Sequence, residues 1–123
     1  DQYRRLLKPL ADAGKITLPF VPEGCEHNGH MFYIKTKDLE ERTRLIDFMK
    51  KKDVLAVFHY VPLHSAPAGR KFGRFHGEDK YTTRESERLL RLPMFYQLTG
   101  VYCRRCKGIL WSIKTGCQKM KTG

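Results

Sequence analysis

A short segment of the chain gathers side chains that could bind a polar ligand. His59, Tyr60 and His64 supply two imidazoles and a phenol, which can donate and accept hydrogen bonds. Because side chains alternate along an extended backbone, His59 should point away from the face that carries Tyr60. Pro62 withholds a backbone donor and keeps the residue before it extended, so the strand should end there. This predicts a polar cluster at the rim of a sheet, where sites are commonly built; the alternative is a strand end with exposed histidines.

The segment that follows, residues 65–80, is rich in glycine and has few apolar anchors. It contains Gly69, Gly73 and Gly77. The composition predicts a surface loop, and a loop of this length is more often functional or mobile than idle.

Apolar periodicity predicts the elements that must position these residues. Strands and helices follow one another with short connections, which is typical of helices laid across a small sheet. We therefore expect an α+β fold with a small mixed or antiparallel sheet and helices packed on one face. In chain order the pattern predicts a helix ending near residue 13, strands at 15–18 and 30–36, a helix at 39–52, a strand at 54–58, a helix at 83–91 and an extended segment at 92–96.

Local signals mark where these helices should begin and end. Asp38 followed by Glu41, and Thr82 followed by Glu85, are both capping boxes. Pro9 interrupts the first helical pattern, so we expect a kink or an early end there.

The formal net charge of +11 invites a nucleic-acid interpretation, but the charge is unevenly placed. Residues 100–123 hold six of the 24 basic residues and no acidic one, so more than half of the excess lies there. This argues against nucleic acid as a partner, although a small basic nucleic-acid-binding or interaction module remains the alternative function. No apolar run approaches the ~20 residues needed to cross a bilayer. We expect no membrane partner and a cytoplasmic location.

Several strings stand in a specific order and spacing: His30–Ile34, then His59–His64, then Phe75–Asp79 with Tyr81–Thr83, then Glu87–Thr99. Together they resemble the C-terminal small domain of pyridoxal-phosphate-dependent sugar-nucleotide aminotransferases. Within that family the similarity is to the enterobacterial transaminases that form dTDP-4-amino-4,6-dideoxygalactose for enterobacterial common antigen. The match covers residues 2–99, and the combination of strings is specific where any single one would be weak.

The resemblance implies an intact enzyme with the aminotransferase type I fold, working as a homodimer with active sites at the subunit interface. Such enzymes move an amino group from glutamate to the 4-keto carbon of a nucleotide-linked deoxysugar. A lysine of the large N-terminal domain holds the cofactor, pyridoxal phosphate, which acts as the electron sink. No lysine here stands in the matching context. The chain also begins at Asp1 already in helical rhythm. We therefore expect a fragment that needs the missing large domain, has no catalytic residue, and binds no cofactor alone.

The resemblance also implies which residues face the substrate. His59, Tyr60 and His64 match the small-domain motif that lies near the nucleotide sugar, so we expect hydrogen bonds to sugar hydroxyls or to the diphosphate. Arg70 and Arg74 could add positive charge for the diphosphate, since guanidinium groups match phosphate oxygens in geometry. The alternative is that both arginines only solvate a flexible loop.

After Thr99 the sequence departs from the family pattern. This divides the chain into a small domain at 1–99 and a divergent basic tail at 100–123, which we expect to be frameshifted or partly disordered. Cys103 and Cys106 invite a zinc interpretation, but Cys117 lacks a close second ligand, so we expect no metal site. The alternative for the tail is an amphipathic helix with one apolar face, made of Cys106, Ile109, Leu110, Ile113 and Cys117.

Overall fold

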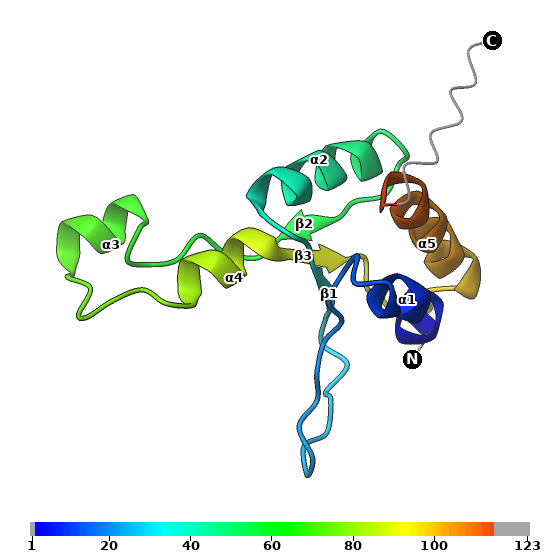
Figure 1. Ribbon diagram of the computed structural model, residues 1–123, viewed down its shortest axis with the longest axis horizontal. Coiled ribbons are helices and arrows are strands. Elements are labelled where there is room, and N and C mark those ends of the chain that lie inside the picture. Colours follow the sequence, from blue (N-terminus) through cyan, green and yellow to red (C-terminus); the bar gives the residue numbers. More distant parts are fainter. Residues whose placement is uncertain (1, 115–123) are drawn as a thin grey trace.

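The computed structural model describes residues 2–114, and a small antiparallel sheet lies at its centre (Figure 1). The sheet has three strands in the order β1-β3-β2, so the last strand of the chain is the middle one. This confirms the expected α+β class with a small antiparallel sheet. The strands are β1 at Phe32–Lys35, β2 at Val57–Phe58 and β3 at Leu89–Leu92.

One face of the sheet carries the core. Phe32 pairs with Leu92 and Ile34 with Leu90, and because paired residues lie on the same side of a sheet, these four form one apolar surface. All four are buried, and the helices cover them. Five helices follow the chain in the described part: α1 at Gln2–Asp12, α2 at Leu39–Lys50, α3 at Pro67–Phe72, α4 at Thr82–Arg88 and α5 at Gly100–Lys114.

Helix α1 runs past Pro9 to Asp12, so the expected early end is not seen. A proline inside a helix costs about 3 kcal/mol. Tyr3, Leu7 and Leu10 offset that cost because all three are buried, at roughly 1.5–3 kcal/mol each. The helix ends at Asp12, close to the predicted end near residue 13. Gly14 follows with a left-handed backbone (φ +67°), and its N–H donates to Ala11 O over 2.9 Å.

The capping prediction holds for helix α2. Asp38 accepts a hydrogen bond from the backbone N–H of Glu41 over 2.9 Å, and the Glu41 carboxylate accepts one from the N–H of Lys37 over 2.7 Å. Leu45 and Met49 are fully buried, whereas Leu39, at the first position of the helix, is 42% exposed.

The second capping prediction is wrong. Tyr81 stands at the N-cap position of α4 and makes no side-chain cap, while Asp79 accepts the N–H of Thr83 at 3.2 Å. The helix also ends at Arg88 rather than near 91, because Leu89 and the three residues after it pair with β1. Residues that the local pattern assigned to a helix therefore form a strand, because they pair with a strand that is distant in sequence.

The glycine-rich segment 65–80 is not all loop, because residues 67–72 form helix α3. Pro67 at its start has the backbone φ that a first helical turn requires, a signal that the glycines obscured. We refer to residues 62–80 as the arm. Figure 1 shows the arm extending to one side of the sheet, away from α1 and α5.

The basic segment after Thr99 forms helix α5, packed beside α1 (Figure 1). Cys103, Cys106, Ile109 and Leu110 are buried and belong to the same core as the rest of the chain. The amphipathic alternative therefore describes residues 100–114, while the side chain of Ile113 and the whole of Cys117 lie outside the described residues. None of the described helices combines the length and the apolar character needed to cross a membrane.

Candidate functional site

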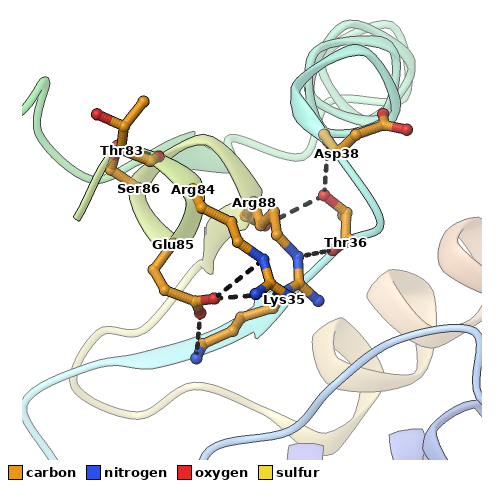
Figure 2. A network of polar contacts seen from close by, with 8 residues as sticks. All are labelled: Lys35, Thr36, Asp38, Thr83, Arg84, Glu85, Ser86 and Arg88. Atoms are coloured by element: carbon orange, nitrogen blue, oxygen red, sulfur yellow. Dashed lines mark hydrogen bonds and ion pairs between the residues drawn. The ribbon is translucent and has the colours of Figure 1, made fainter. Parts of the chain in front are cut away.

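Helix α4 carries one side of the candidate site, and a polar network fixes it to the sheet (Figure 2). Glu85 of α4 bonds Lys35 of β1 at 2.5 Å and Arg88 at 3.2 Å. Arg88 also donates through Nε to the carbonyl oxygen of Thr36 over 2.8 Å. Since these contacts join α4 to the edge strand β1, the start of α4 is held in a fixed position.

This network predicts an acid-sensitive contribution to stability. The bond from Lys35 keeps the pKa of the Glu85 carboxyl below its ordinary value. A carboxyl whose pKa is lowered by folding stabilises the protein above its unfolded pKa, about 4.3, and loses that effect as the pH falls through the folded pKa. Glu85→Gln should therefore cost about 1 kcal/mol at neutral pH and progressively less as the pH falls below the unfolded pKa. Urea unfolding at neutral pH and at successively lower pH measures it, with the exposed Glu78→Gln as the control, and a loss that is the same at every pH would contradict it.

His59 and Tyr60 follow β2 and lie in contact with each other. Their ring centroids are 4.6 Å apart. Arg91 of β3 donates toward His59 Nδ1 at 3.4 Å, so His59 faces the half-exposed side of the sheet. Tyr60 is 73% exposed and borders a separate hollow of about 310 Å³ beside Phe58. The two rings are thus neighbours, although alternation along an extended backbone predicts that they point to opposite faces.

His64 and Arg74 lie together on a cavity of about 580 Å³ within the arm. The remaining lining is chiefly apolar and includes Leu63, Phe72 and Phe75. Arg70 is exposed on α3 and is not part of this lining. Of the five predicted binding residues, the structure therefore brings His59 together with Tyr60, and His64 together with Arg74, and leaves Arg70 apart.

The sequence did not single out the two residues that hold His64. Its Nε2 lies 2.9 Å from a carboxylate oxygen of Asp79 and 3.3 Å from the hydroxyl of Thr83. Thr83 donates to the same Asp79 oxygen, and this bond is the main reason that the pKa of Asp79 is lowered. The ring of Phe75 packs on the other side of the imidazole, with centroids 4.6 Å apart. An acid just before a helix start is the signal that points to Asp79, whereas the capping-box pattern points to Thr82.

A close backbone approach shapes the arm. Gly69 in helix α3 lies so near Leu63 that a Cβ at this position would be 1.6 Å from the Leu63 carbonyl oxygen. Only glycine fits there, because the obstacle is backbone that cannot rotate away. Because His64 directly follows Leu63, this contact also fixes the backbone position from which the imidazole extends.

One group that pyridoxal phosphate chemistry needs is not in the lining of the arm cavity. A Schiff base requires an amine, and no lysine is among the residues that line the arm cavity in the described part of the chain. Lys35 and Lys114 are held in ion pairs with Glu85 and Glu41. This cavity offers an imidazole, a guanidinium and an apolar lining, which suit the binding and orientation of a polar ligand.

Cys103 and Cys106 do not form a reactive pair. Both are buried, and burial raises the pKa of each thiol. Tyr3 donates its hydroxyl proton to the Pro93 carbonyl at 2.9 Å and has its oxygen 3.5 Å from the Cys106 sulfur. Within residues 2–114 no cluster of three metal-ligating side chains exists. In this structure the two cysteines act as small core residues.

No family model matches the sequence, but solved structures share the fold. TlmJ, an aminotransferase from Streptoalloteichus hindustanus, matches with a TM-score of 0.75 and 20% identity over 94% of this chain and 30% of its own. DesV of S. venezuelae, solved with a ketimine intermediate, gives 0.74 and 21% over 98% and 31%. A DegT DnrJ EryC1 StrS aminotransferase from Brucella abortus gives 0.69 and 20% over 92% and 29%. The chain thus has the fold of a part of these aminotransferases and spans about 30% of their length.

Proposed function

We propose that this chain is the C-terminal small domain of a pyridoxal-phosphate-dependent sugar-nucleotide aminotransferase and supplies part of the surface facing the nucleotide sugar. The observation that supports this most is the match to three aminotransferases over at least 92% of this chain but at most 31% of theirs. A domain with this fold and no lysine in its cavity needs a second domain to hold the cofactor. We infer that a large N-terminal domain is that partner.

The finer assignment rests on the sequence strings. Their resemblance to transaminases that form dTDP-4-amino-4,6-dideoxygalactose supports a 4-keto-6-deoxy nucleotide sugar as substrate and glutamate as amino donor. The product would enter enterobacterial common antigen, and the intact enzyme would be a cytoplasmic homodimer. In this assignment His59, Tyr60 and His64 bind sugar hydroxyls or diphosphate, and Arg74 serves the diphosphate from the rim of the arm cavity.

The surface of the arm supports the need for a partner domain. Leu63, Phe72 and Tyr81 are between 71% and 80% exposed, and all three lie in or directly beside the arm. Apolar side chains gathered in this way usually mark a docking surface. We infer that the large domain covers them in the intact enzyme.

The test begins with the coding sequence upstream of this segment, which should encode in frame a large domain with a Schiff-base lysine. The joined protein should convert a dTDP-4-keto-6-deoxy sugar and glutamate into the amino sugar, whereas this chain alone should not. His64→Ala in the joined protein should raise KM for the nucleotide sugar about tenfold, the loss expected for one hydrogen bond to substrate. His76→Ala is the control, because His76 is exposed and outside the cavity. Transamination by residues 1–123 alone would overturn the proposal.

A further inference from the structure

The imidazole of His64 meets a carboxylate on only one of its nitrogens. Nε2 lies 2.9 Å from Asp79 Oδ2 and 3.3 Å from Thr83 Oγ1. An ionised carboxylate can only accept hydrogen bonds, and the bonds from Thr83 keep the pKa of Asp79 low, so it stays ionised at neutral pH. At a pH where the ring carries one proton, that proton therefore belongs to Nε2, which leaves Nδ1 as an acceptor.

Hydrogen bonds from Thr83 hold the carboxylate of Asp79 in place. Its Oδ2 accepts both the backbone N–H of Thr83, at 3.2 Å, and the Thr83 hydroxyl. Thr83 lies in the first turn of α4, the helix that Glu85 ties to Lys35 of β1 (Figure 2). The position of Asp79 therefore depends on the central sheet as well as on the arm.

The other nitrogen of the ring is left for a ligand. Phe75 packs against the imidazole, and His64 lines the arm cavity together with Arg74. The hydrogen bond and the ion pair that His64 makes within residues 2–114 both involve Nε2, and neither uses Nδ1. A polar atom without a partner, on a ring held at its edge and its face, is suited to bind a group that enters the cavity.

We propose that Asp79 is a positioning residue that, buttressed by Thr83, fixes neutral His64 with its proton on Nε2 and leaves Nδ1 as an acceptor for a ligand hydroxyl in the arm cavity. An accepting nitrogen can bind a hydroxyl but not a phosphate oxygen, so the two side chains would bind different groups of the ligand. His64 would take a sugar hydroxyl, and Arg74 the anionic group. The identity of the ligand rests on the proposed function, whereas the state of the imidazole does not.

The direct test is long-range ¹H–¹⁵N NMR of the chain labelled in histidine, at a pH where the rings are neutral. We expect His64 to be almost wholly in the Nε2–H form, while the exposed His76 in the same spectrum shows a mixture. Asp79→Ala should shift His64 to a mixture as well, and Asp79→Asn, which keeps an acceptor oxygen, should restore the Nε2–H form. Glu78→Ala removes a neighbouring exposed acid and should change nothing.

Two outcomes would overturn the proposal: a mixed or Nδ1–H state of His64 in the unaltered chain, or an unchanged state in Asp79→Ala. The first needs no variant, so it decides the matter even if Asp79→Ala loosens the arm. In the joined enzyme, Asp79→Ala should raise KM for the nucleotide sugar about tenfold, with Asp79→Asn recovering most of it. An Nε2–H state without this change in KM would overturn the role of Nδ1 in binding the ligand, whereas a joined protein without transaminase activity would contradict the proposed function instead.

Discussion

Glu41→Leu is expected to lower the free energy of unfolding by about 3–5 kcal/mol, the cost of leaving a buried charge without its partner. Lys114, at the end of α5, is that charge. Its Nζ lies 2.5 Å from a Glu41 oxygen, and its side chain is only 3% exposed. The same carboxylate accepts the N–H of Lys37 at the start of α2, so one substitution weakens both the closure of α5 on α2 and the helix cap. Urea unfolding followed by circular dichroism measures the change.

The double substitution Glu41→Leu with Lys114→Met separates the two effects. With no charge left in the interior, most of the loss should be recovered, and the remainder of about 1 kcal/mol is the cap. The matched control is Glu40→Leu, because Glu40 is 80% exposed and 3.8 Å from Arg44, and it should change stability by less than about 0.5 kcal/mol. A double variant no more stable than the single one would contradict the pairing.

Gly69→Ala should detach helix α3 from the turn that precedes it. The added methyl would lie 1.6 Å from the Leu63 carbonyl oxygen, so either the helix or the turn must move. Overpacking of this kind costs about 1–3 kcal/mol and often more, and here it falls on the arm rather than on the core. Limited proteolysis within residues 62–80 should accelerate about tenfold or more, while the helical signal of the remaining chain persists.

Gly108→Ala is the matching control for this substitution. Gly108 also lies inside a helix, α5, but a Cβ there would meet nothing within 4 Å. It should raise stability by about 0.5–1 kcal/mol, because alanine favours the helix. If Gly69→Ala left the arm as resistant to protease as before, the close approach of α3 to Leu63 would be refuted.

Local signals in the sequence were sufficient where a structure depends on neighbouring residues. Asp38 and Glu41 start α2 as predicted, since both caps act within four positions of each other. The α4–β3 boundary was missed because Leu90, which fits a helical pattern, is taken by pairing with Ile34 of a distant strand. Helix α3 was missed because two of its six residues are glycine or proline, which locally favour a loop.

The candidate site shows the same limit. The string around His59 and His64 could be recognised as chemistry-bearing, although alternation predicted that His59 and Tyr60 point apart and their rings lie in contact. Nothing local indicated that Asp79, fifteen positions later, would meet His64, because that contact depends on the chain turning back through α3. The residue types show which chemistry is available, but the fold determines which of these residues line the same cavity.

The arm adds nothing to the hydrophobic interior. Across residues 57–89, all within the described part of the chain, no side chain is buried, and every core residue comes from the segments on either side. Changes of size or charge on the arm should therefore cost the domain little of its folding free energy. Substitutions on the arm can therefore accumulate without compensating mutations in the core, which makes the arm a suitable target for directed evolution.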